Sequence, residues 1–220
     1  MIRIAILSDT HSLLRPEVEE VLEKCDYILH AGDIASKDVY EKIKEFGKSY
    51  FVRGNADKDW AKEIPADAEF AIGGLRFYMV HNIKHARKEL TDVDFLVYGH
   101  SHKYENRAVG EIIYLNPGSC GPRRFTQPVT MMVMLVDEVD GSYQIEKKDF
   151  SPILKKGTKI PSTKEMDKLI TNIIKDMNAN RSVEQIASRN RVEEDLVKEI
   201  LQIYTTHPGI DIDGILNRMK

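Results

Sequence analysis

Short apolar runs alternate with polar turns through the first part of the chain. Runs of strand length occupy Ile2–Leu7, Tyr27–His30 and Tyr50–Val52, and apolar runs of this size between turn residues are typical of buried strands. Between them, Pro16–Cys25 and 36–47 carry apolar residues three and four apart, which is the period of an amphipathic helix. The proline that opens the first of these segments and the glycine that closes the second fit the preferences of helix ends. This order of strands and helices predicts an α/β fold.

Hairpins follow in the middle of the chain. The segments Glu69–Ile72 and Leu75–His81 flank Gly73-Gly74, a dipeptide that readily adopts the positive φ angles of a two-residue hairpin turn. An Asp-Gly pair indicates another turn, between the last two of four further strands. Those four strands are predicted at Phe95–Tyr98, Ile112–Leu115, Thr130–Val136 and Tyr143–Lys147. Strands with helices early and hairpins late predict a mixed α/β sandwich.

The pattern changes after residue 150. Prolines, a glycine and lysines in 151–162 are typical of a linker. In 163–177 the apolar residues lie on one stripe of an amphipathic helix, and 182–205 resembles a helix-turn-helix with Ser182 as the cap of its first helix. We therefore expect three parts, which are an α/β domain over 1–150, a linker over 151–162 and an all-helical extension over 163–220.

Charge bears on what the helical extension binds. The 220-residue chain has a formal net charge of -3, which argues against a general attraction to nucleic acid. The second helix of the helix-turn-helix-like segment begins with Glu193, Glu194 and Asp195, so carboxylates stand where phosphates would be met. We expect a packing or dimerisation module, with a homo-oligomer as one outcome. A tail that binds nucleic acid beside a domain that cleaves a nucleotide signal is the disfavoured alternative.

The chain shows no basic, apolar leader and no apolar run near the length of a membrane span. We expect a cytoplasmic protein without a membrane partner. Cys25 and Cys120 are too few and too far apart to suggest a disulfide framework or a zinc ribbon. Both are expected to be reduced thiols without a chemical role.

Side chains of metal-ligand type follow five of the predicted strands. The carboxyl ends of strands in an open α/β sheet line the ligand crevice, so residues far apart in sequence can converge there. Each residue alone has an ordinary explanation as a turn, a cap or a hydrogen-bonded group, but five strand ends in succession favour a shared site. The residues are Asp9, His11, Asp33, Asn55, His81, His100 and His102.

The donor set indicates the kind of metal. Two carboxylates, four imidazoles and one amide oxygen suit manganese, iron, cobalt, nickel or zinc better than a metal that prefers thiolates. Seven donors are too many for one tetrahedral site. They fit two ions that share a bridging carboxylate and keep positions open for water or substrate.

In this order the motifs resemble those of the calcineurin-like metallophosphoesterases, and within them the small prokaryotic phosphodiesterase branch. The resemblance lies in Asp9-x-His11, Gly32-Asp33, Gly54-Asn55, His81 and the run from Gly99 to His102. The sequence "LNPGS" at Leu115–Ser119 followed by Pro122-Arg123 is also similar to that branch, and the resemblance covers about residues 1–150.

The resemblance implies a four-layer α/β/β/α sandwich with two mixed sheets and two divalent ions, with Mn²⁺ as the first choice and Ni²⁺, Co²⁺, Fe²⁺ or Zn²⁺ as alternatives. By position, it implies that Asp9, His11, Asp33 and His102 hold one ion. It further implies that Asp33, Asn55, His81 and His100 hold the other and act in catalysis, with Asp33 as the bridge.

The implied reaction is hydrolysis of a small phosphodiester or nucleotide-type substrate by a hydroxide that bridges the ions. A relative in the retromer coat keeps this fold as a surface for partners. The alternative prediction is therefore a catalytically weak scaffold that binds a protein through the fold surface or the C-terminal helices.

The chain departs from the family pattern at two positions. Ala56 stands where many members have a histidine thought to protonate the leaving group, which favours phosphodiesters with good leaving groups. Asn82 stands where members usually have glycine, and its Cβ makes that backbone less permissive.

Several basic side chains near the motifs have a structural interpretation, and most of them also have a functional alternative. His30 is expected to be a buried, hydrogen-bonded strand histidine, with support of a metal ligand as the alternative. His85 is expected on a solvated face. Surface pairing is expected for Arg53 and for Arg123-Arg124, with contact to a substrate phosphate as the alternative.

Overall fold

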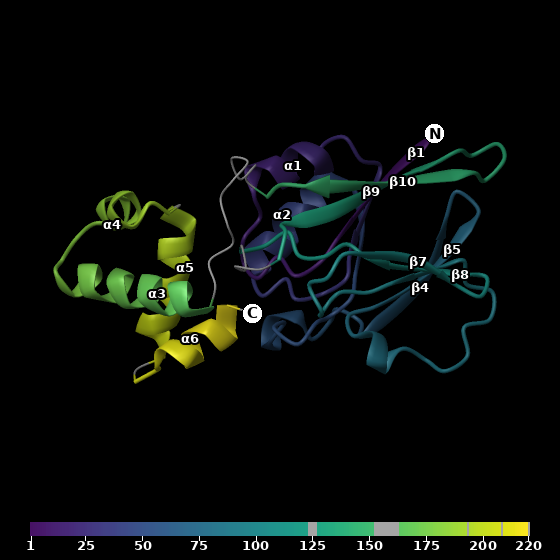
Figure 1. The fold of residues 1–220 in the computed structure, drawn as a ribbon. Coiled ribbons are helices and arrows are strands. Elements are labelled where there is room, and N and C mark those ends of the chain that lie inside the picture. Colours follow the sequence, from purple (N-terminus) through teal and green to yellow (C-terminus); the bar gives the residue numbers. More distant parts are fainter. Residues whose placement is uncertain (123–126, 152–162, 193, 208, 220) are drawn as a thin grey trace. The chain divides into compact units, whose positions relative to one another are not determined.

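The computed structural model describes residues 1–122, 127–151, 163–192, 194–207 and 209–219 (Figure 1). Two compact units contain them, one formed by 1–122 with 128–151 and the other containing the helices that follow residue 162. Most of the expected linker, the Arg123-Arg124 pair and Glu193 lie outside the described residues.

The first sheet contains the strands predicted from the N-terminal apolar runs. Its three parallel strands are joined by two helices, and two antiparallel strands from the end of the unit complete it. Its order is β10 (Tyr143–Asp149), β9 (Thr130–Val136), β1 (Ile2–Leu7), β2 (Tyr27–His30) and β3 (Lys48–Phe51), with α1 (Pro16–Leu22) and α2 (Lys37–Phe46) as the connecting helices.

The second sheet is also mixed. A hairpin lies at one edge, the three central strands β5, β6 and β8 run parallel, and an antiparallel strand closes the other edge. Its order is β4 (Asp67–Ile72), β5 (Leu75–Val80), β6 (Phe95–Val97), β8 (Ile112–Asn116) and β7 (Glu105–Val109). Two short 3₁₀ turns, η1 (Asp59–Ala61) and η2 (Ile83–His85), stand beside these strands in sequence.

Alternating side chains of the strands form separate apolar layers. Ile4 of β1 packs with Phe77 and Phe95 of the second sheet in the layer between the sheets. Leu7, which points the other way, packs in the layer under α1 and α2. The outer face of the second sheet packs against η2 and the loop that follows it, with Tyr78 in that layer. The predicted fold class, an α/β sandwich of two mixed sheets with a helical extension, is confirmed.

The described residues of the second unit include four helices, which form a core of their own. Ser182 caps α4 through a reciprocal capping box with Gln185, as its position before the apolar stripe predicts. Inward-facing side chains from all four helices form one apolar cluster, among them Met166, Ile170, Ile186, Val197 and Ile215. The helices are α3 (Thr163–Asn178), α4 (Val183–Asn190), α5 (Glu194–Thr206) and α6 (Ile212–Met219).

One strand is absent from the sequence-based expectation. The residues of β7 (Glu105–Val109) are mostly exposed, and their side chains show no apolar run. Antiparallel pairing with β8 at the sheet edge makes this segment a strand. No described helix has the length and apolar content of a membrane span.

Candidate metal centre

The predicted ligands meet where parallel strands of both sheets end. Asp9 and His11 follow β1, Asp33 follows β2, His81 follows β5 and His102 comes soon after β6. Two overlapping groups offer ligand atoms that all lie within 4.8 Å of one another. They are Asp9 with His11 and His102, and Asp9 with Asp33 and His81.

The first group is built around a buried carboxylate. Asp9 is fully buried, and its Oδ1 lies 3.1 Å from Nε2 of His102 and 3.8 Å from Nε2 of His11. The two histidine Nε2 atoms are 3.3 Å apart, and Nε2 of His11 is also 3.9 Å from Oδ2 of Asp33. Asp9, His11 and His102 therefore offer three ligand atoms for one ion. A carboxylate oxygen of Asp33 is a fourth, more distant one.

The second group joins Asp33 to His81, a buried side chain. Nε2 of His81 lies 3.4 Å from Oδ1 of Asp33, and Nδ1 of His81 lies 2.8 Å from the carbonyl oxygen of Ala31. That carbonyl accepts the Nδ1–H, so Nε2 is the ring atom that faces the carboxylate. Burial lowers the pKa of His81, but Asp33 outweighs it and the pKa is raised. Asp33 thus contacts a histidine of each group.

These two groups consist of histidines and carboxylates. His100 lies beside them, and the amide ligand Asn55 lies near His81. The ring of His100 is edge-on to the ring of His81, with ring centroids 5.3 Å apart. The His100 residue is exposed to solvent. Asn55 is exposed and shares a pocket with His81. Of the seven predicted residues, five are gathered and two border the His81 side.

The backbone at the site lies in an uncommon conformation. Positive φ angles occur at Asp9 (55°), His11 (43°), Asp33 (56°), His100 (67°) and His102 (56°). Non-glycine residues in sparsely populated regions cost on the order of 1–3 kcal/mol each and cluster at functional sites. These turns aim side chains from successive strand ends at one point, at a cost to stability.

A glycine makes the approach of the β6 loop possible. A Cβ on Gly99 would lie 2.7 Å from Oδ2 of Asp9 and 2.9 Å from Oγ of Ser8, and real Cβ atoms do not come this close to their neighbours. The next residue, His100, donates its backbone N–H to the same Oδ2 at 3.1 Å. The loop that carries both histidines is therefore held directly against Asp9.

Comparison with known proteins agrees with this architecture. The model of the calcineurin-like phosphoesterase superfamily domain matches residues 2–139. The chain belongs to the calcineurin-like phosphoesterase superfamily. A probable metallophosphoesterase of Methanothermobacter thermautotrophicus is 29% identical over 148 residues, which cover 61% of this chain and 86% of the relative. A phosphodiesterase of Methanocaldococcus jannaschii is 26% identical over 140 residues, covering 54% and 84% respectively.

Solved structures show the same fold at lower identity. Vps29 of Entamoeba histolytica, solved in complex with zinc, is 22% identical with a TM-score of 0.53, and the match covers 68% of this chain and all of that one. An archaeal phosphodiesterase is 23% identical with a TM-score of 0.51 and coverage of 67% and 100%. The resemblance to this superfamily, stated from the motifs, is confirmed.

This phosphoesterase superfamily is metal-dependent, and the site suits a divalent ion. Oδ1 of Asp9 and Nε2 of His81 are buried without a hydrogen-bond partner, and so is Nδ1 of His102. Buried polar atoms without partners are costly, and an ion among the ligand atoms would satisfy the first two. Nitrogen and carboxylate donors together suit first-row divalent metals.

Neighbouring imidazoles keep the carboxylates of the candidate metal centre ionised. Burial alone would raise the pKa of Asp9, but the neighbouring His102, 3.1 Å away, outweighs burial and the pKa is lowered. Burial of Asp33 is likewise outweighed by His81, and its pKa falls. Burial and the neighbouring His81 lower the pKa of His100, so this ring is neutral and able to act as a ligand near pH 7.

Asp57 supports the candidate metal centre and is not among the residues predicted from the sequence. It is 6% exposed, and its carboxylate accepts the backbone N–H groups of Asp33 (3.0 Å), Ala35 (2.7 Å) and Gly54 (2.7 Å). It ties the loop after β2 to the loop after β3. Its place two residues after the motif asparagine was the available signal, because aspartate in a turn commonly accepts backbone N–H groups.

Asn116 plays the same part on the second sheet and was also not singled out from the sequence. This fully buried side chain donates to the carbonyl oxygen of Gly99 at 2.9 Å and accepts the N–H of Gly118 at 3.0 Å. It therefore holds the loop that carries His100 and His102.

His30 is a buried, hydrogen-bonded histidine, as expected. Its Nδ1 accepts the N–H of Gly32 at 3.2 Å, so the neutral ring carries its proton on Nε2 and donates it to Oγ1 of Thr10, 3.0 Å away. Burial lowers the pKa of His30 to about 4. Its partners place it under the turn that presents Asp33.

Asn82, which stands where family members usually have glycine, adopts its backbone conformation without strain. Asn82 has φ -110° and ψ 120°, an extended conformation open to any residue. Its Oδ1 accepts the N–H of Lys84 at 3.0 Å and so caps η2. His81 keeps its place in the site beside it.

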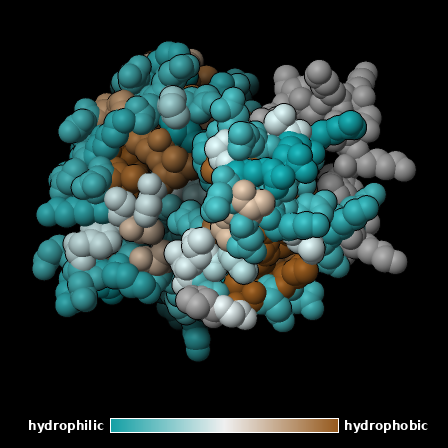
Figure 2. All heavy atoms as spheres, turned by 90° about the vertical axis from the view of Figure 1, so that its left-hand side faces the viewer, coloured by the Kyte–Doolittle hydropathy of each residue, from teal (hydrophilic) through white to brown (hydrophobic). Residues whose placement is uncertain are grey.

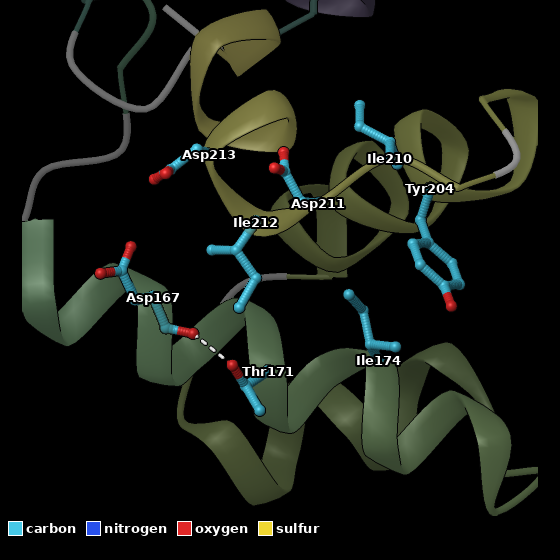
Figure 3. Close-up of a pocket in the computed structure, with 8 residues that line it drawn as sticks. All are labelled: Asp167, Thr171, Ile174, Tyr204, Ile210, Asp211, Ile212 and Asp213. Atoms are coloured by element: carbon cyan, nitrogen blue, oxygen red, sulfur yellow. Dashed lines mark hydrogen bonds between the residues drawn. The ribbon is translucent and has the colours of Figure 1, made fainter.

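The helical unit has a hollow of a different kind, of about 590 Å³ (Figure 3). Ile174, Ile210 and Ile212 line it together with three aspartates and no imidazole. Asp211 caps α6 by accepting the N–H of Gly214 at 2.7 Å. All seven predicted ligands lie in the α/β unit and none of them lines this hollow.

Figure 2 shows a mostly hydrophilic face on which hydrophobic side chains gather in separate patches.

Proposed function

We propose that this chain is a dinuclear metal-dependent phosphodiesterase, with Mn²⁺ as the first choice of ion. Asp9, His11 and His102 would hold one ion, His81, His100 and Asn55 the other, and Asp33 would bridge them. The observation that carries the proposal is the position of Asp33, whose two oxygens face His11 at 3.9 Å and His81 at 3.4 Å.

Two ions bound there would acidify a water molecule between them and stabilise negative charge on a phosphoryl group. The chain's own residues prepare this site. The Ala56 N–H donates to Oδ1 of Asp33 at 2.7 Å and holds that carboxylate ionised and oriented. The carbonyl of Ala31 fixes the ring of His81.

The cysteine near the site is not a nucleophile. Cys120 is fully buried, and burial raises the pKa of its thiol to about 12. A thiol in this state is inert at neutral pH, because the thiolate is the reactive form. This supports a mechanism in which water attacks the phosphorus.

The substrate class follows from Ala56. Its methyl group cannot donate a proton, so the chain offers no side-chain acid at that position. Departure of an unprotonated oxygen is easiest for leaving groups of low pKa. We therefore propose small phosphodiesters or nucleotide-type esters as substrates, in keeping with the phosphodiesterase among the relatives.

The test is metal removal and return. Chelator-treated protein should regain hydrolysis of bis(4-nitrophenyl) phosphate when Mn²⁺ is added. Asp33→Ala should lose more than the roughly 10–100-fold in metal affinity that supporting residues typically cost, because both ions lose a ligand. Asp59→Ala is the matched control, since Asp59 is exposed and pairs only with Lys62 among the described residues.

Two outcomes decide between enzyme and scaffold. Absence of hydrolysis with every first-row divalent ion, although calorimetry shows that the ions bind at Asp33, would contradict the phosphodiesterase. It would favour a scaffold that keeps the metal site, and the fold shared with zinc-bound Vps29 makes this the second candidate.

A further inference from the structure

A pocket of about 280 Å³ adjoins the candidate metal centre on the His81 side. Two of the proposed ligands, Asn55 and His81, form part of its wall, and Arg53, Asp67, Asn82 and His85 line the rest. A phosphoryl group held at the ligands would therefore have one of its ester substituents next to this pocket.

Arg53 lines the pocket, and its backbone is held by a hydrogen bond. Its N–H donates to the carbonyl oxygen of Pro65 at 2.8 Å. No residue of the described part of the chain forms an ion pair or hydrogen bond with its guanidinium. Asp67, the carboxylate of the pocket, accepts the hydroxyl of Tyr78 at Oδ2 (2.8 Å), and it forms no ion pair with Arg53 among the described residues.

Three other arginines of the same unit behave differently, whereas Arg15 donates its Nε–H to the carbonyl oxygen of Gly121. Their guanidinium groups reach a nearby carboxylate, as surface arginines ordinarily do. The pairs are Arg76 with Asp92, Arg87 with Glu69 and Arg107 with Glu105. Among the described residues, Arg53 has no such surface partner.

The remaining polar groups of the pocket add hydrogen-bond donors. Asn82 has its side-chain oxygen occupied by the N–H of Lys84, which leaves its amide NH₂ as the available part. His85 is exposed, and its backbone N–H is tied to the carbonyl oxygen of Asn82 at 2.8 Å. A guanidinium, an imidazole and an amide NH₂ together match an anionic group.

We propose that this pocket binds an ester substituent that carries a second anionic group, a carboxylate or a phosphate, and that Arg53 is the residue that selects it. The inference rests on the proposed phosphodiesterase function. It narrows the substrate class to phosphodiesters with an additional negative charge beside the scissile phosphate.

The experiment uses two matched pairs of activated diesters. In the first pair, 4-nitrophenol is the leaving group of both diesters. The ester group that stays on the phosphorus ends in a carboxylate in one diester and in the isosteric carboxamide in the other. In the other pair the same two groups are placed on the leaving nitrophenol. Within each pair size is constant, so a difference in kcat/KM reports the charge.

Mn²⁺-loaded wild-type protein should prefer the carboxylate of at least one pair by about tenfold, as expected for a partly exposed charge-assisted bond. Arg53→Gln should abolish the preference through KM with kcat unchanged, and Arg53→Glu should reverse it. Lys62→Gln removes an exposed cation that does not line the pocket, and this variant should retain the preference for the carboxylate. The preference should shrink at high salt, because ions screen an exposed pair.

The outcomes separate this inference from the function beneath it. If no ester is hydrolysed with any divalent ion, the proposed function fails. If all four are hydrolysed and neither wild-type protein nor Arg53→Gln distinguishes carboxylate from carboxamide, the pocket inference fails and the phosphodiesterase stands. Calorimetric Mn²⁺ binding by Arg53→Gln should equal that of the wild type, and a loss would show that Arg53 acts through the metal centre instead.

Discussion

Single buried side chains beneath the metal centre decide how its ligands are presented. His30 bonds the Gly32 N–H and Thr10 at the ends of the first two strands. Asp57 bonds three backbone N–H groups around Asp33. Such residues never touch a substrate, yet each fixes the direction of a ligand through backbone hydrogen bonds. Their effects should therefore appear in stability and metal affinity before turnover.

His30 gives a pH-dependent prediction at this scale. Its pKa is about 4 in the folded chain against a usual 6.5, so the unfolded chain binds the proton more tightly. Stability is complete above pH 6.5 and falls as the pH is lowered toward 4. The shift corresponds to about 3 kcal/mol.

Urea unfolding of metal-free protein between pH 7 and pH 4 measures this loss. Wild-type protein should lose about 3 kcal/mol more than His30→Gln over that range, because glutamine keeps a donor and an acceptor but does not titrate. Parallel pH profiles for the two proteins would show that His30 is not the responsible group.

At the scale of elements, the loop after β6 is a tightly packed connection of the site. Gly99 lies against Asp9 and Ser8, and Asn116 of β8 holds its carbonyl oxygen. The loop thereby packs on the end of β1, a strand of the other sheet. This contact between sheets places His102 within 3.1 Å of Asp9.

Gly99→Ala should therefore damage the metal site through sterics alone. The added Cβ would lie 2.7 Å from the Asp9 carboxylate, so the loop must shift. Overpacking of this kind costs about 1–3 kcal/mol, and we expect Mn²⁺ affinity to fall by roughly 10–100-fold. Isothermal titration and thermal unfolding measure the two effects.

Gly110→Ala is the control for Gly99→Ala. Gly110 has φ 62° and no atom within 4 Å of a built Cβ, so it should show backbone strain of about 1 kcal/mol without a change in metal binding. Equal metal affinity in both variants would refute the steric explanation.

At the scale of the whole molecule, two units have separate cores. Apolar layers on both sides of the first sheet stabilise the α/β unit. The helices from residue 163 onward form their own cluster. There Asp176, 7% exposed, also bonds Arg181 at 2.8 Å and Asn190 at 3.0 Å. Among the described residues, each of these apolar clusters draws its members from one unit.

We therefore predict that a chain ending at Ser151 folds and retains the metal-dependent activity. All seven predicted ligands and Arg53 lie within residues 1–151. Its kcat/KM for an activated diester should differ from that of the full chain by less than about tenfold. Circular dichroism, Mn²⁺ titration and kinetics check this. A folded, metal-binding fragment with no activity would assign the helical extension a part in catalysis.

Local pattern was sufficient for much of the fold. The strands β1, β2 and β9 have the predicted bounds because each is a continuous apolar run buried on both faces. The burial of Ile186 and Ala187 follows from helical spacing in the same way. The polar residues after successive strands, read in order, were also enough to identify the superfamily.

Tertiary structure alone decided what depends on partners distant in sequence. The polar segment β7 is a strand because β8 pairs with it. Asp57 supports the site because backbone N–H groups from two loops converge on it, and Tyr78 bonds Asp67 in the pocket that Arg53 also lines. Sequence by itself determined which elements form and which residue types stand at their ends, since periodicity and composition are local properties. Only the folded chain determined which of those residues meet, because hydrogen bonds, close approaches and charge pairing depend on distances across the two sheets.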